Sequence, residues 1–270
     1  SDQDGEEGLS LGCGALNVLM NFALMFPKPL AECDAEAVFG GARTLLRSVC
    51  PSPLHVGIVY KSFTSGVKVA PQNCNFKGCG AYTGEMAADQ MTSMNIKWCL
   101  IGHSERRGEF GLPTPAESSE LLATKMAYLI SKGINVILAI GEPLSVREKG
   151  DDAVLAHCVE QLKPCVAHLA PAKVVIAYEP VWSIGTGVTA SPEQAQSTHK
   201  LIRDWLKANV DPTIPGCADA MRIQYGGSAN AKNAPELSKC PDVDGFLVGG
   251  ASLKAEFADI VAAIAAEKKA

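Results

Sequence analysis

The sequence contains no apolar run long enough to predict a membrane span. The uncharged stretch LGCGALNVLMNFALMF at residues 11–26 includes Asn17 and Asn21, whereas a transmembrane helix needs about 18–20 apolar residues. The leader before it, residues 1–10, is acidic, whereas a signal peptide begins with basic residues. We therefore predict an acidic leader, followed by a buried strand and a turn or helix, in place of a membrane anchor or an export signal.

Runs of lysine and arginine are absent as well. The chain of 270 residues has 24 Lys and Arg against 29 Asp and Glu, which is a formal net charge of −5. A negative net charge without a basic patch favours solubility, and it argues against binding to nucleic acid or to an anionic membrane surface. We expect neither nucleic acid nor membrane among the partners.

Cysteine is plentiful, but metal-ligand spacing is lacking. The chain has ten cysteines and no CxxC pair, and Cys74 and Cys79 stand without a His/Cys cluster. A chain of this length with 47% hydrophobic residues can bury a full core without disulfides. We interpret the cysteines as reduced, buried, small apolar side chains. This predicts no metal site and a reducing compartment, either the cytoplasm or the interior of an organelle.

No linker, low-complexity block or charge run divides the chain, so we expect one domain over residues 11–270. Short apolar runs recur along it, and their near-continuous hydrophobicity is typical of parallel strands covered on both faces. The first run falls within residues 11–19. The others are at 48–50, 67–70, 97–102, 135–141, 173–178, 222–226 and 245–249.

Amphipathic segments separate these runs. One of them, PAESSELLATKMAYLISKG, repeats apolar residues on one helical face and stops at Gly133; another opens with Ser191 as N-cap and Pro192 as the first helical residue. Strands alternating with helices, eight times in about 250 residues, predict a single (β/α)8 barrel. The alternative is an open doubly wound sheet, but its usual GxGxxG after the first strand is poorly matched by LGCGALN.

The ends of the predicted strands carry candidate catalytic side chains, and barrel active sites lie at these ends. Glu179 follows an apolar strand, where burial raises the proton affinity of a carboxylate and suits it to act as a general base. The alternative is a structural acid in an ion pair. His103 ends another strand just before SERR. It is either a hydrogen-bonded core residue or a neutral donor to a carbonyl oxygen.

Glycines follow the last two predicted strands. Gly226, Gly227 and Ser228 come after one, and Gly249 and Gly250 after the next. Backbone N–H groups at such positions bind phosphate, although each cluster could also be a simple turn. The segment PVWSIGTGVTA has a stiff start, a Gly-rich middle and a small-residue end, so we predict a lid with two hinges.

Five motifs together resemble the triosephosphate isomerase family: QNCNFKGCGAYTGE, IGHSERR, AYEPVWSIGTG, YGGS and DVDGFLVGGASLK. The resemblance runs from about residue 47 to the C-terminus and implies a TIM barrel. It implies that Glu179 is the base moving a proton between two carbons of a triose phosphate, and that His103 is the electrophile that polarises the carbonyl. Glu105 matches the acid beside them in the motif. In this family the surroundings of the two side chains tune their pKa values to these roles.

The same resemblance implies the ligand and the assembly. Gly185, Ser228, Gly249 and Gly250 match the residues that hold the substrate phosphate, and no metal or cofactor is required. The family is usually dimeric, and the loop around Thr83 in GAYTGE would reach into the partner's site.

One position departs from the family. Its first strand ends in a motif of the form GNWKMN, and aligning Met20 and Asn21 with MN sets Asn17 on the family's first Asn and Leu19 on its Lys. No Lys or Arg occurs in residues 9–27, and the next is Lys28. Three explanations stay open. The chain is a weak or rescued isomerase, or an inactive barrel that serves as an assembly subunit, or its first segment comes from a wrongly joined exon.

Overall fold

The computed structural model describes residues 21–25, 46–62, 67–108, 115–186 and 188–267. Strands within these ranges lie close to the apolar runs of the sequence. Their bounds are β1 Asn21–Met25, β2 Leu46–Cys50, β3 Lys68–Val69, β4 Trp98–Ile101, β5 Asn135–Ile140, β6 Val174–Tyr178, β7 Arg222–Tyr225 and β8 Gly245–Val248.

The strands form one 8-stranded sheet in the order β3-β2-β1-β8-β7-β6-β5-β4. Strands β4 to β8 are all parallel, and so are β2 and β3. The two edge strands meet, because Leu100 N donates to Pro71 O at 2.9 Å across the gap between β4 and the end of β3. The sheet therefore curls into the barrel that the sequence predicted.

The first strand differs from the prediction. The strand between β2 and β8 is Asn21–Met25, whereas the sequence placed it within residues 11–19, of which none lies in the described ranges. It runs antiparallel to both neighbours, pairing Asn21 with Cys50 and Met25 with Gly245. The reason is that the run at residues 11–26 is uncharged and mostly apolar, and a pattern without regular polar alternation specifies neither register nor direction.

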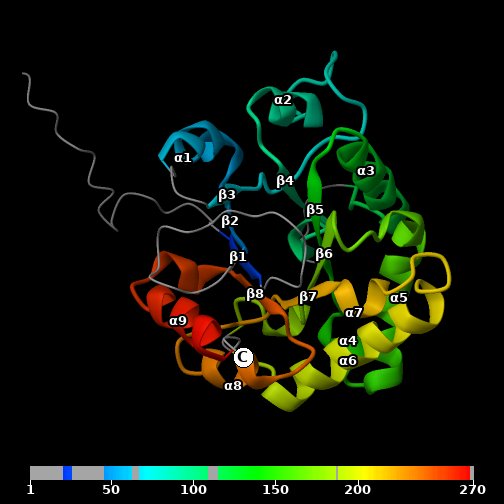
Figure 1. The fold of residues 1–270 in the computed structure, drawn as a ribbon, viewed down its shortest axis with the longest axis vertical. Coiled ribbons are helices and arrows are strands. Elements are labelled where there is room, and N and C mark those ends of the chain that lie inside the picture. The colour runs from blue at the N-terminus through cyan, green and yellow to red at the C-terminus, as the bar shows by residue number, and fades with distance from the viewer. Residues whose placement is uncertain (1–20, 26–45, 63–66, 109–114, 187, 268–270) are drawn as a thin grey trace, which may run out of the picture.

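Helices surround the sheet, as the ribbon in Figure 1 shows. Those described have the bounds α1 Val56–Ser62, α2 Ala88–Ser93, α3 Ser119–Ser131, α4 Leu144–Arg147, α5 Asp151–Leu162, α6 Pro192–Asn209, α7 Cys217–Ala220, α8 Ala234–Lys239 and α9 Phe257–Glu267. Single 3-10 turns lie at η1 Pro53–His55, η2 Ser104–Arg106, η3 Lys163–His168, η4 Val181–Ser183 and η5 Gly250–Leu253. No helix in the described ranges is both long and apolar enough to cross a bilayer.

Helix ends follow the signals in the sequence. Ser191 is the N-cap of α6, and its hydroxyl accepts from Gln194 N at 3.2 Å while the Gln194 side chain accepts from Ser191 N at 2.9 Å. This reciprocal pair satisfies two amides that the first turn leaves free. Gly133 follows α3 with a φ of +72°, where a side chain would be strained. Both predicted helix boundaries are confirmed.

The strands are the centre of the core. Strands β4, β6, β7 and β8 are buried at every residue, so both faces are covered, as a barrel wrapped by helices requires. Most cysteines with described surroundings are buried, which confirms the predicted burial for them. These are Cys50, Cys74, Cys99, Cys158, Cys165, Cys217 and Cys240. Cys79 is the exception, since it is exposed.

Candidate active site

The carboxyl ends of four parallel strands meet around one cavity of about 430 Å³. The cavity lies where barrel enzymes place their active sites, because each of its walls follows the end of β4, β6, β7 or β8. Its lining residues are His103, Glu105, Glu179, Ile184, Gly185, Gly226, Gly227, Ser228, Ala229, Asn230, Leu247, Gly249, Gly250, Ala251, Lys254 and Glu256. Every candidate site residue of the sequence within the described ranges is among them. Asn17 lies outside those ranges.

Glycines on the neighbouring strands make room for Glu179. Its amide still belongs to the sheet, donating to Ile140 O at 2.7 Å. A Cβ atom on Gly141 would stand 1.7 Å from the Glu179 carbonyl oxygen, and one on Gly226 would stand 2.8 Å from Glu179 Cγ. Real Cβ atoms essentially never come this close, so Gly141 makes room for the backbone of Glu179 and Gly226 for its side chain.

The carboxyl group of Glu179 is buried, with 1% of the residue exposed. Its Oε2 accepts from Ser104 N at 3.0 Å, and its Oε1 lies 3.3 Å from His103 Nε2. Burial raises the pKa of Glu179, while the neighbouring His103 ring, the Ser104 amide and Arg107 oppose that rise. A carboxylate with raised proton affinity, held beside an imidazole, is suited to accept a proton.

The hydrogen bonds of His103 indicate its tautomer. Its Nδ1 accepts from Glu105 N at 3.3 Å, in the first turn of η2. Glu105 Oε2 also lies 3.5 Å from Nδ1, but that side chain is 49% exposed, and the backbone amide is the better aligned partner. A nitrogen that accepts a hydrogen bond carries no proton, so the hydrogen is on Nε2. The ring therefore presents an N–H toward the cavity.

The opposite wall of the cavity is built from backbone and small side chains. The Ser228 hydroxyl donates to Ser183 O, which ties the loop after β7 to η4. Gly249 precedes η5 without a side-chain cap, so no capping side chain occupies the start of this turn. Gly185 is exposed and adopts a φ of +69°. Gly185, Ser228, Gly249 and Gly250 thus surround one space, with their backbone available to an anion.

The segment after Glu179 is anchored at its start. Trp182 Nε1 donates to Glu142 Oε1 at 2.9 Å, and Tyr178 OH donates to the same oxygen at 3.0 Å. Burial raises the pKa of Glu142, opposed by these two hydrogen bonds. Beyond this anchor the chain turns outward through Gly185 and Thr186, both exposed, so the predicted lid has a fixed entry and an open middle.

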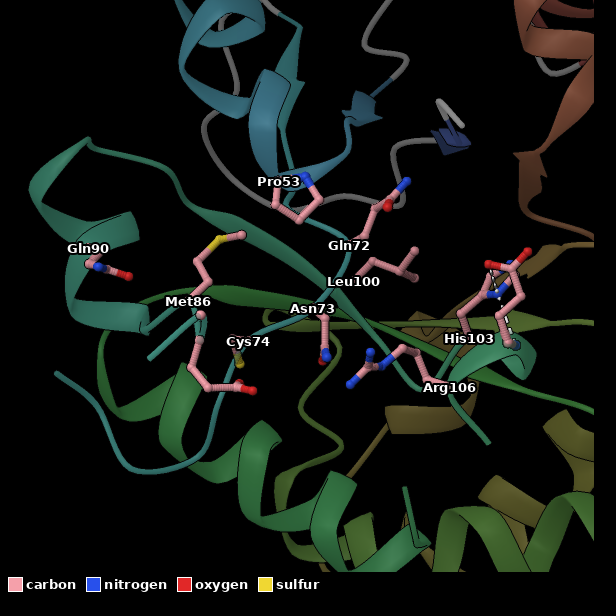
Figure 2. A pocket seen from close by; sticks show the side chains of 12 residues that line it. Pro53, Gln72, Asn73, Cys74, Met86, Gln90, Leu100, His103 and Arg106 are labelled. Atoms are coloured by element: carbon pink, nitrogen blue, oxygen red, sulfur yellow. Dashed lines mark hydrogen bonds and ion pairs between the residues drawn. The ribbon is translucent and has the colours of Figure 1, made fainter. Parts of the chain in front are cut away.

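A second cavity of about 550 Å³ adjoins the first, and the two share His103 and Glu105. Figure 2 shows it between α2 and the segment that carries His103 and Arg106, with the Arg106 side chain extended toward Asn73. Its lining residues are Pro53, Gln72, Asn73, Cys74, Gly84, Glu85, Met86, Gln90, Leu100, His103, Glu105 and Arg106.

An ion-pair network braces this second cavity. Glu117 Oε1 receives Arg106 Nε at 2.9 Å, Lys125 Nζ at 2.9 Å and Asn73 Nδ2 at 3.2 Å. Although burial opposes it, these cations lower the pKa of Glu117. Arg107 is committed elsewhere, since it donates to Gly102 O at 2.7 Å and to Ala139 O at 2.9 Å. Both arginines of IGHSERR therefore have structural partners.

The sequence did not indicate the supporting residues of the site. The Ser104 amide binds Glu179, which is 75 residues away in the sequence, and the Glu142 carboxylate binds Trp182. No local pattern predicts such distant pairs. Lys254 was overlooked although it ends the motif GGASLK. Within the described ranges no group of three or more His, Cys, Asp or Glu side chains is placed to hold a metal ion.

Known proteins are similar to this chain over most of its length. Residues 30–264 match the family described as triosephosphate isomerase. The chain is 49% identical over 198 residues to "Triosephosphate isomerase" of Taenia solium, which covers 73% of this chain and 76% of that protein. It is 45% identical over 218 residues to the cytosolic enzyme of Oryza sativa subsp. japonica, covering 79% and 81%. It is 44% identical over 222 residues to a chloroplastic one of Secale cereale, covering 82% and 71%.

Proposed function

The chain belongs to the triosephosphate isomerase family, and from this membership we propose that it interconverts dihydroxyacetone phosphate and D-glyceraldehyde 3-phosphate. The observation that carries the proposal is the pair of Glu179 and His103, whose Oε1 and Nε2 lie 3.3 Å apart at the floor of the cavity. A base and an N–H donor side by side suit proton transfer next to a carbonyl group.

In the proposed reaction Glu179 removes the proton from the carbon next to the carbonyl group. His103 Nε2–H donates to the carbonyl oxygen, which stabilises the negative charge that develops there. Glu179 then returns the proton to the former carbonyl carbon, while His103 gives its Nε2 proton to the former carbonyl oxygen and takes the proton of the neighbouring hydroxyl group, so that the carbonyl and hydroxyl groups change places. Glu105, near His103 Nδ1, positions the imidazole. No electron transfer occurs, so the proposal includes no cofactor.

The phosphate is proposed to bind at the opposite wall. Gly185, Ser228, Gly249 and Gly250 line that space, and backbone N–H groups can hold dianions without a side-chain cation. The lid at Gly185 would close over the bound substrate and exclude water, which strengthens each charge interaction inside. Asn17 is proposed, from the family motif alone, to contact the substrate as well.

The missing lysine is proposed to weaken this isomerase. Asn21 lies at the catalytic end of the barrel, beside Cys50 at the end of β2, and Leu19 precedes it by two positions in the sequence. The chain leaves β1 at Met25 beside Gly245, the first residue of β8 and thus at the opposite end; Lys28 itself lies outside the described residues. Removing one oxyanion donor costs about 10²–10³ in rate, so we expect slow turnover.

The test is a coupled assay of both directions with the full chain and with Glu179→Gln and Leu19→Lys. We expect measurable turnover that Glu179→Gln lowers by about 10²–10⁴ and Leu19→Lys raises. Glu236→Gln, an exposed acid on α8, is the matched control. A parent chain without turnover that Leu19→Lys restores would mean a damaged site. An inactive chain that Leu19→Lys leaves inactive would favour the alternative of a non-catalytic assembly subunit.

We further propose a homodimer through the loop around Thr83. The loop is internally braced, because the Asn75 carboxamide accepts from Lys77 N and Gly78 N and donates to Gly78 O. Its tip is exposed, including 40% of Tyr82, and the 550 Å³ cavity beside His103 offers a space of suitable size for the same loop of a second copy. We propose a cytoplasmic location, with an organelle as the alternative, because the cysteines indicate a reducing compartment and the relatives include a cytosolic and a chloroplastic protein.

A further inference from the structure

The cavity proposed to hold a triose phosphate is rich in acids. Glu105, Glu179 and Glu256 line it, and within the described ranges Lys254 is the one lysine or arginine that does so. A ligand with a dianionic phosphate would be repelled by these carboxylates, so a cation at this position has a direct electrostatic effect on binding.

The backbone places Lys254 next to the proposed phosphate cradle. It follows η5, whose first residue is Gly250, and its amide donates to Ala251 O at 3.2 Å. Ser252 N donates to Gly249 O at 2.9 Å in the same turn. The root of the lysine side chain is therefore fixed relative to the glycine amides, while the flexible stem lets the ammonium group reach into the cavity.

The ammonium group is available to a ligand. Its ion pair with Glu256 is long, 3.6 Å from Nζ to Oε1, and the two side chains are 68% and 32% exposed. Such surface pairs are weak. The arginines nearest to His103 are not available, because Arg106 binds Glu117 and Arg107 binds two backbone carbonyls.

We propose that Lys254 supplies the side-chain cation for the phosphate group of the substrate, a role that rests on the isomerase function proposed above. The sequence has no Lys or Arg in residues 9–27, so the charge that the family motif carries on its first strand is absent there. Lys254 offsets part of that loss from the other side of the cavity. It acts on binding and does not touch the reacting carbons.

The test measures inorganic phosphate binding and triose phosphate kinetics for Lys254→Met, which keeps the apolar stem and removes the charge. At about 20 mM salt we expect the phosphate Kd and the substrate KM to rise about fivefold to tenfold, as for a partly exposed charge pair, and kcat to change less than about twofold. The difference should shrink at about 500 mM salt, where charges are screened within a few ångströms. Lys254→Arg should restore both constants.

Two further variants sharpen the result. Glu256→Gln removes the competing carboxylate, so it should lower the phosphate Kd by about twofold to fivefold. Lys239→Met is the matched control, because Lys239 is an exposed lysine paired with Glu236 at 2.7 Å outside the cavity, and it should leave both constants unchanged.

The outcomes separate this inference from the proposed function. Phosphate affinity that is the same in Lys254→Met and in the parent chain at low salt overturns the role of Lys254, even where turnover is normal. Lys254-dependent phosphate binding in a chain without turnover supports the cation role and overturns the isomerase proposal.

Discussion

The carboxyl group of Glu179 receives two polar contacts in a nearly closed environment, from the Ser104 amide and from the edge of His103. Desolvation disfavours its charged form more than these contacts favour it, so its pKa is raised. A base must be deprotonated to act. The raised pKa means that Glu179 becomes protonated, and catalysis fails, at a higher pH than an exposed glutamate would allow.

This is testable by carbon NMR of the glutamate carboxyl groups. Below neutral pH we expect the Glu179 signal to titrate with a midpoint above the value of about 4.3 found for exposed glutamates. The signal is assigned as the one missing in Glu179→Gln. NMR is preferable to a rate profile, because the substrate phosphate ionises near pH 6, as phosphoserine does. A midpoint at or below that of exposed Glu236 would contradict the expectation.

His199 is a second buried titratable residue, away from the site. Burial lowers its pKa to about 4, and its Nδ1 lies 3.2 Å from Asp242 O. Its ring packs edge-on against Tyr178, with centroids 5.6 Å apart. Because the folded pKa is below the unfolded value of about 6.5, the folded state is favoured at pH 7. That stability is lost as the pH falls from about 6.5 toward 4.

We therefore expect His199 to cost the protein about 2 kcal/mol of unfolding free energy between pH 7 and pH 5. The measurement is urea unfolding at both pH values for the parent chain and for His199→Phe. The comparison uses the difference between pH 7 and pH 5 within each chain, so a lower overall stability of the variant does not matter. An equal loss of unfolding free energy between pH 7 and pH 5 in the two chains would show that His199 is not the cause.

At the scale of the elements, α6 depends on its first turn. Ser191 and Gln194 exchange two hydrogen bonds there, and the lid segment that ends at buried Ala190 joins the helix at this cap. The cap thus stabilises the helix, and it holds the end of the segment that we predict to be a lid.

Ser191→Ala should lower the unfolding free energy by about 1 kcal/mol, since the amide of Gln194 in the first turn loses its partner. Denaturant unfolding at pH 7 measures this. Ser131→Ala is the control: Ser131 is exposed at the other end of a helix, where its hydroxyl donates to Tyr128 O, and we expect a much smaller change. A loss below a few tenths of a kcal/mol for Ser191→Ala would show that water replaces the cap.

At the scale of the whole molecule, the curled sheet brings the loop at 73–86 next to the segment that carries His103 (Figure 2). The cavity between them shares two residues with the proposed active site. If a second copy fills it, the order of His103 and Glu105 depends on the dimer.

Two consequences of a dimer can be measured. The thermal midpoint should rise with protein concentration, because dissociation precedes or accompanies unfolding, and the specific activity should fall on dilution. Thr83→Arg, at the exposed loop tip, should give a monomer in sedimentation velocity and lower activity. Leu144→Asp alters a 52% exposed side chain elsewhere and serves as the control. A concentration-independent midpoint with a monomeric parent chain would contradict the dimer.

Much of the architecture was predictable from local pattern. Seven of the predicted apolar runs became strands within about two residues, and Ser191 and Gly133 end their helices as predicted. These features depend on side-chain periodicity and on the conformational preferences of single residues, which the sequence displays directly. The candidate site could be predicted because the strand ends are visible in the sequence, and the polar residues and glycines that follow them are too.

Other features depend on which distant segments meet. The direction of β1 is defined by its antiparallel pairing with β2 and β8, which places Asn21 beside Cys50 and Met25 beside Gly245. A mostly apolar run does not indicate in the sequence which direction its strand will take. Trp182 and Tyr178 both donate to Glu142. Glu142 follows the end of β5, a different strand from the one that precedes Trp182.

The sequence by itself determined two helix boundaries, seven strands, the family and the candidate site residues, because periodicity, capping and motif are local. Only the tertiary structure decided that Glu179 is buried against His103, that both arginines of IGHSERR already have partners, and that Lys254 lines the cavity. Proton affinity and available charge depend on desolvation and on neighbours in space, and these exist only once the chain has closed into a barrel.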